Sequence, residues 1–131
     1  MIEAEVLMGS ESPTLIARLE EALLGALMNG GSLPPNHGLT STSFSDFRCR
    51  LVFNAITELI HRAFEHDLVA VEMQLKKDGT LDKVGAAHLS DMLLTKTGNG
   101  AQYVSELGCI PTYVRLIKEA AMERRMRELK K

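Results

Sequence analysis

The sequence predicts an all-α fold, a compact bundle of about five to six helices. Apolar residues recur at spacings of three and four along most of the chain, which is the period of a helix with one buried side. Gly and Pro separate these stripes, and no strand-like alternation is sustained over several residues. A chain of 131 residues that is 45% hydrophobic suits one domain with its own core.

The first helix is expected to begin at Pro13, after a loose N-terminal arm over residues 1–12. Ser12 is a good capping residue, and Pro at the first helical position loses no hydrogen bond. Asn29-Gly30-Gly31 should end the helix. Its apolar stripe is Leu15, Leu19, Ala22, Leu23, Ala26 and Leu27.

Residues 30–43 should form a loop, because Pro34-Pro35 and several glycines oppose a long helix. Phe44 is expected to fill the core just before a second helix from about Asp46 to Phe64. The apolar stripe expected for this helix is Cys49, Val52, Phe53, Ile56, Leu59, Ile60 and Ala63.

A short extended linker is expected over residues 67–69, before a third helix that ends at Gly79. Leu81 and Val84 should dock inward. A fourth helix is expected to close near residues 97–100, and the last helix should run from Pro111 to the chain end. The apolar positions are Val71, Met73 and Leu75 in the third helix, Leu89, Met92 and Leu93 in the fourth, and Tyr113, Leu116, Ile117, Ala120 and Ala121 in the last.

The seven methionines raise a separate question about surfaces. Met28, Met73 and Met92 have core spacing. Met122 and Met126 lie among charges on the last helix, where the pattern leaves a core role and an adaptable binding face equally open.

The charge pattern argues against a protein that coats nucleic acid through bulk charge, because the formal net charge is only −2. The residues from Arg115 to the end nevertheless include seven basic and three acidic side chains, which makes the tail basic. No apolar run is long enough for a membrane span, and the acidic start is unlike a signal peptide, so we expect a cytoplasmic protein.

The sequence predicts no catalytic residue, no cofactor and no metal site. It contains neither a phosphate-binding P-loop nor a Gly-x-Ser-x-Gly nucleophile motif. The pair Asp46 and Glu58 is interpreted as a helix cap and a solvated side chain. Cys49 and Cys109 are interpreted as reduced, half-buried thiols, although one disulfide is possible. The histidines are scattered at positions 37, 61, 66 and 88.

Four strings, in order, resemble the N-terminal domain of the DnaB-type replicative DNA helicases. They are residues 22–28 (ALLGALM), 50–53 (RLVF) after Phe44, 67–85 (DLVAVEMQLKKDGTLDKVG) and 112–121 (TYVRLIKEAA). The third string is the best match. Cys49 stands where the family usually has His, and Ala70 replaces the usual capping Thr or Asp, so the chain resembles a divergent member.

This resemblance implies a globular body over residues 13–110 and a C-terminal helix over 111–131 that corresponds to the first arm of a helical hairpin. The family's ATPase domain would follow and is absent from these residues. The implied function is a non-catalytic collar domain that mediates subunit association and contacts primase or a helicase loader, with DNA contacted only indirectly and no membrane partner. We place the interface on this last helix, where the candidate residues are Tyr113, Ile117, Ala120, Ala121, Arg124, Arg125 and Arg127. The alternative is that the apolar residues from Tyr113 to Ala121 pack on the body of the domain while the basic side chains stay solvated.

Two alternatives stay open at this point. One is a stand-alone phage or mobile-element adaptor or inhibitor that mimics this domain. The other is a helical DNA-binding domain that uses the basic C-terminal helix.

Overall fold

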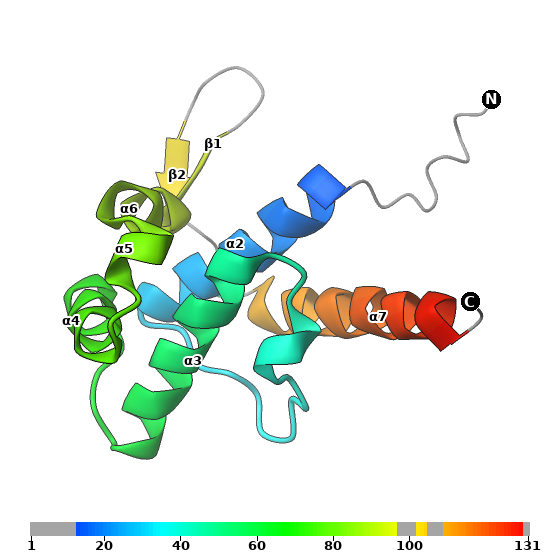
Figure 1. Ribbon diagram of the computed structural model, residues 1–131, viewed down its shortest axis with the longest axis horizontal. Coiled ribbons are helices and arrows are strands. Elements are labelled where there is room, and N and C mark those ends of the chain that lie inside the picture. The colour runs from blue at the N-terminus through cyan, green and yellow to red at the C-terminus, as the bar shows by residue number, and fades with distance from the viewer. Residues whose placement is uncertain (1–12, 97–101, 105–108, 130–131) are drawn as a thin grey trace.

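The computed structural model describes residues 13–96, 102–104 and 109–129 (Figure 1). The predicted arm over residues 1–12 lies outside this range. The elements in chain order are α2 (Pro13–Met28), the short 3-10 helix η1 (Ser41–Ser43), α3 (Phe47–His61), α4 (Leu68–Asp78), α5 (Leu81–Val84), α6 (Ala86–Leu93), β1 (Leu94–Lys96), β2 (Gln102–Val104) and α7 (Ile110–Leu129).

The predicted helical fold is confirmed, with one small addition. After α6, β1 pairs with β2 as a two-stranded antiparallel ribbon in which Leu94 faces Val104. Three residues per strand are too few to show an alternation, so the sequence pattern could not reveal the ribbon. The fourth helix therefore ends at Leu93 rather than near residues 97–100.

Helix α2 occupies the centre of the domain, in contact with α7, α6 and α3, while α4 packs against α3 (Figure 1). Its C-terminal half is buried nearly all round, because these neighbours cover different sides of it. As predicted, Phe44 is fully buried just before α3, and its ring lies 4.8 Å from that of Phe53. The remaining core contains Val52, Ile56, Val71, Leu75, Val84, Leu89 and Met92.

The buried stripes are narrower than the sequence predicted. Leu15, Ile60, Met73 and Leu116 were expected to be buried but are 41–68% exposed. Met73 illustrates the reason. It lies two residues from both Val71 and Leu75, so the helical period turns it away from the side through which α4 packs on α3.

Helix α3 ends at His61, earlier than the predicted Phe64. The N–H of Phe64 donates to the carbonyl of Leu59 and that of Ala63 to Ile60, which is the Schellman pattern of a helix end. Ala63 adopts the left-handed conformation that this pattern requires, with φ of 59°. It is therefore an exposed terminating residue rather than a core residue of the helix.

Helix α4 begins at Leu68, where the sequence predicted an extended linker. The Asp67 side chain accepts a hydrogen bond of 2.9 Å from the backbone N–H of Ala70. Asp67 therefore caps α4, although Ala70 stands where the family usually has a capping Thr or Asp. The helix ends at Gly79 as predicted, with the glycine in the left-handed region at φ 77°.

Among the described residues, no helix combines the length and the apolarity that crossing a membrane would require.

Candidate protein-interaction surface

The inner side of α7 packs on the body of the domain. Ile110, Val114 and Ile117 are at most 5% exposed, and α7 lies against α2. Tyr113 is partly buried against the same core. Ile117 was expected at an interface, but the structure places it in the core of its own chain.

Arg124 also contacts the body of its own chain. Its Nη2 donates to the carbonyl oxygens of Thr42 and Ser43, each at 3.2 Å. These bonds hold α7 to η1. Ala120 and Ala121 are half-buried one turn earlier. Most of the predicted interface residues thus lie on, or beside, the side of α7 that is already covered.

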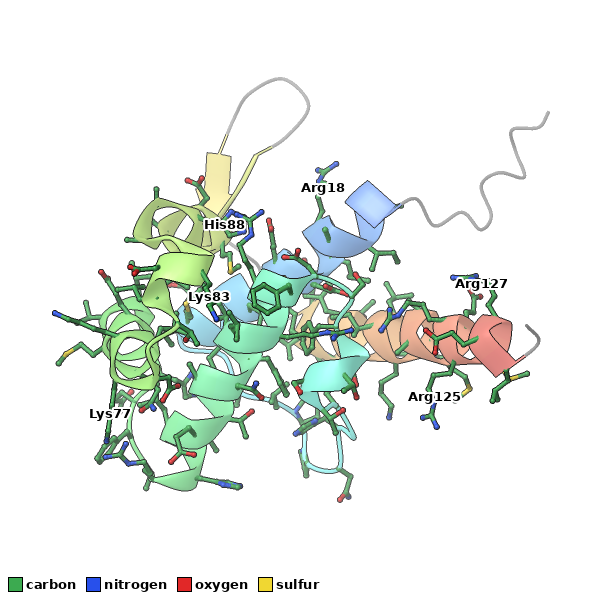
Figure 2. The ribbon with its side chains drawn as sticks, viewed as in Figure 1. Arg18, Lys77, Lys83, His88, Arg125 and Arg127 are labelled. Carbon is green, nitrogen blue, oxygen red and sulfur yellow. The ribbon has the colours of Figure 1, made fainter. Side chains whose placement is uncertain are left out.

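Arg125 and Arg127 extend into solvent near the end of α7 (Figure 2). Arg127 lies 4.0 Å from Glu123, one helical turn earlier, as an exposed ion pair. Such a pair contributes only a few tenths of a kcal/mol. These charges are therefore free to rearrange around a partner.

The outer side of α7 carries a second apolar stripe. Met122, Met126 and Leu129 are 66%, 53% and 80% exposed, and they recur at spacings of four and three. At about 100° per residue they point roughly 120–180° away from Ile117. The question left open for Met122 and Met126 is answered here, because neither residue is part of the core.

A hollow continues this stripe toward the start of the helix. It has a volume of about 370 Å³ and lies between the Pro34–His37 segment and α7, where Pro111, Lys118 and Met122 line it. These helix residues share a side with Met126 and Leu129 because they are separated by seven, four, four and three residues. The stripe and the hollow together form the candidate surface on the outer side of α7.

Glu20 is a buried carboxyl that was not predicted to have a structural or functional role. Its side chain is 0% exposed and accepts hydrogen bonds from the backbone N–H groups of Ser45, at 2.7 Å, and Asp46, at 3.2 Å. Burial raises the pKa of Glu20 above its ordinary value of 4.5, although these hydrogen bonds and the nearby Arg124 act in the opposite direction. Glu20 thus fastens the start of α3 to α2.

A signal for this role was present in the sequence. Glu20 lies three and four residues before Leu23 and Leu24, which places it on the side of α2 that is buried. A charged residue at such a position needs hydrogen-bond partners.

Cys49 is fully buried and Cys109 is half-buried, and both are free thiols. Burial above all, and then the carboxylates of Glu20, Asp46 and Glu21, raises the pKa of the Cys49 thiol. Cys49 therefore stays protonated and unreactive in the folded protein.

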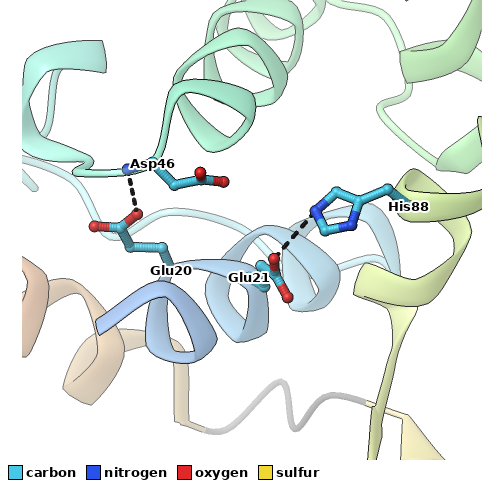
Figure 3. A network of polar contacts seen from close by, with 4 residues as sticks. All are labelled: Glu20, Glu21, Asp46 and His88. Carbon is cyan, nitrogen blue, oxygen red and sulfur yellow. Dashed lines mark hydrogen bonds and ion pairs between the residues drawn. The ribbon is translucent and has the colours of Figure 1, made fainter. Parts of the chain in front are cut away.

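A polar cluster lies beside Glu20. Nε2 of His88 on α6 is 3.1 Å from a carboxylate oxygen of Glu21 on α2 (Figure 3). The ligand atoms of Glu21, Asp46 and His88 all lie within 4.8 Å of one another. Sequence spacing could not reveal this cluster, since its members come from three separate elements.

Comparisons with known proteins agree with this architecture. The family model described as DnaB-like helicase N terminal domain matches residues 13–119. A crystal structure of the N-terminal domain of DnaB helicase from Mycobacterium tuberculosis is similar in fold, with a TM-score of 0.69 and 22% sequence identity. The match covers 85% of this chain and 76% of that chain. Among curated proteins, none matches the sequence at a significant level.

Proposed function

The chain belongs to the family of DnaB-like helicase N-terminal domains, which confirms the resemblance seen in its sequence, and we propose that it is a collar domain of a replicative DNA helicase. A domain of this family is non-catalytic and acts by binding. In this proposal it works in the cytoplasm, associates with further copies of itself, and offers a docking surface to primase or a helicase loader. The ATP-dependent motor would be supplied by an ATPase domain of the parent protein.

The observation that supports self-association is the exposed stripe of Met122, Met126 and Leu129. A helix that only packed on its own domain would need one apolar side, whereas α7 has two. Methionine side chains are flexible and polarizable, so they suit a face that adapts to a partner.

The charged residues around the stripe fit the same role. Glu123, Arg125 and Arg127 are exposed beside it, and both signs of charge are present. Two copies of α7 related by a two-fold axis would shelter six large apolar side chains, while these charges stay at a solvated rim. The predicted interface residues Arg125 and Arg127 keep this rim role, and the outer stripe replaces Ile117 as the apolar centre.

The decisive experiment compares two methionines that have similar exposure. Met126 on α7 is 53% exposed and Met73 on α4 is 68% exposed. We expect the wild-type domain to form dimers or larger assemblies in sedimentation equilibrium at high micromolar concentration. Met126→Asp should weaken association at least about tenfold, because a charge would be buried in the interface.

Met73→Asp is the matched control, since it makes the same chemical change on another exposed helix. It should leave the association constant unchanged. A wild-type domain that stays monomeric at high concentration would contradict the self-association part of the proposal, as would equal effects of the two substitutions.

Partner recruitment and DNA contact need separate measurements. We expect primase or the loader of the same replication system to co-sediment with the domain. We expect no DNA binding at low salt, since the net charge is −2 and any contact with DNA is indirect. DNA affinity that falls steeply with salt would instead favour a DNA-binding role for the basic part of α7.

A further inference from the structure

We propose that Glu21, Asp46 and His88 form a binding site for a transition-metal dication, with Zn²⁺ as the best-fitting ion. The three side chains come from α2, from the residue that precedes α3, and from α6. Their donor atoms lie within 4.8 Å of one another, and all three residues are half-buried. The inference is independent of the self-association proposed for α7.

The distances suit a small metal ion. Zn²⁺ binds imidazole nitrogen and carboxylate oxygen at about 2.0–2.2 Å in tetrahedral geometry, so two ligand atoms on it are roughly 3.3–3.5 Å apart. Nε2 of His88 and Oε2 of Glu21 are 3.1 Å apart, close to that separation. The ligand atoms of the three residues lie up to 4.8 Å apart, which is more than the roughly 3.3–3.5 Å between two ligands on one zinc ion. The Asp46 side chain would therefore have to move by about 1 Å or slightly more to bind the same ion.

The surroundings of the His88 imidazole indicate that it binds a ligand. Its Nε2 atom is buried and has no hydrogen-bond partner among the described residues, although the Glu21 carboxylate is 3.1 Å away. A buried polar nitrogen that makes no aligned hydrogen bond is costly. A metal ion would engage its lone pair and both carboxylates at once. Figure 3 shows the side chains of Glu21 and His88 turned toward each other.

The arrangement around Asp46 holds its carboxylate near this site. Its backbone N–H is bound by Glu20, the residue before Glu21, which fastens the start of α3 to α2 (Figure 3). Asp46 occupies the N-cap position of α3, yet its side chain makes no capping hydrogen bond. The Asp46 carboxylate instead accepts a hydrogen bond from the thiol of Cys49, so it is not committed to capping α3.

The donor set identifies the class of ion. One borderline imidazole nitrogen combined with two hard carboxylate oxygens suits Zn²⁺ and its first-row neighbours rather than a metal that prefers soft thiolate ligands. Two ionised carboxylates also neutralise the charge of a dication, so the loaded site would be neutral overall. Three protein ligands leave a fourth position for water. Because the ligands belong to three elements, the bound ion would fasten α2, α3 and α6 together.

The test is titration of the metal-stripped chain with zinc chloride, followed by calorimetry and thermal unfolding. We expect saturable 1:1 binding and a rise in Tm of about 10 °C when free zinc is at a hundred times the Kd. His88→Ala and Glu21→Gln should each raise the Kd at least about tenfold. The Tm of each metal-free variant shows whether that variant still folds. If His88→Ala fails to fold, the isosteric Glu21→Gln still tests the site.

His61→Ala is the matched control, because His61 is an exposed histidine at the end of α3 and should not affect binding. Cobalt(II) provides a spectroscopic readout, with visible bands of a four-coordinate site and no thiolate charge-transfer band. Absence of 1:1 binding, an unchanged Kd in His88→Ala, or a thiolate band that places the metal on cysteine would each overturn the proposal and leave Glu21 and His88 as an ion pair only.

Discussion

The two sides of α7 differ in the kind of apolar residue that they use. The inner side buries Ile110, Val114 and Ile117, which are β-branched and stiff. The outer side exposes Met122 and Met126, which are flexible, together with Leu129. Stiff side chains lose little conformational freedom in a permanent core, whereas flexible ones can adjust to a partner that arrives later. One helix can therefore serve both its own fold and an assembly.

The largest effect is expected on the inner side. Ile117→Ala removes a side chain that is 1% exposed and leaves a cavity in the core of the domain. The unfolding free energy should fall by about 2–5 kcal/mol. Urea denaturation at low protein concentration, where association does not contribute, measures this difference.

Leu116→Ala is the control for that prediction, because Leu116 is the preceding residue and is 43% exposed. It should cost less than about 1 kcal/mol, since little buried surface is removed. Equal losses for the two substitutions would contradict the burial of Ile117 in the core of its own domain.

An intermediate effect is expected at Glu20, where α2, the start of α3 and the Arg124 charge meet. Glu20→Ala would leave the backbone N–H groups of Ser45 and Asp46 without their acceptor. The unfolding free energy should fall by about 1–3 kcal/mol. Denaturant unfolding of Glu20→Ala should be compared with that of Glu21→Ala, which removes a neighbouring carboxyl that binds neither N–H group. The difference between the two losses separates the hydrogen-bonding role of Glu20 from a general effect of charge.

The pH dependence at Glu20 has a definite sign. Its pKa is raised above 4.5 in the folded protein, so the folded state holds this proton more tightly than the unfolded state. Stability should therefore fall as pH rises from 4.5 through the raised pKa. Glu20→Gln cannot ionise, so the stability of the wild type minus that of this variant should decrease over the same window. A difference that is flat or increases with pH would contradict the raised pKa.

Sequence patterns predicted the ends of helices correctly where the residue type at the end has one dominant structural role. Gly79 marked the end of α4, because glycine readily adopts the left-handed conformation. Ala63 adopts the same conformation at the end of α3, but alanine carries no such signal, so the predicted helix was too long. Asp67 could have been identified as a cap, since it lies three residues before the N–H that it binds.

The candidate surface was only partly predictable for a related reason. Helical spacing identified the apolar residues of α7, but it could not show which side α2 would cover. Ile117 and Arg124 were therefore placed at an interface although they contact their own domain. The cluster of Glu21, Asp46 and His88 was beyond sequence reasoning, because only the packing of α2, α3 and α6 brings it together.

The smallest effect on intrinsic stability is expected on the outer side of α7. The double substitution Met122→Ala and Met126→Ala removes exposed side chains and keeps good helix formers, so unfolding at low protein concentration should change by less than about 0.5 kcal/mol. Association stabilises the folded state by mass action, so the Tm of the wild type should rise with protein concentration while that of the variant stays nearly constant. Thermal scans over a hundredfold range of concentration measure both slopes. Parallel slopes would mean that the outer stripe does not contribute to assembly, whereas a large loss at low concentration would mean that it belongs to the core.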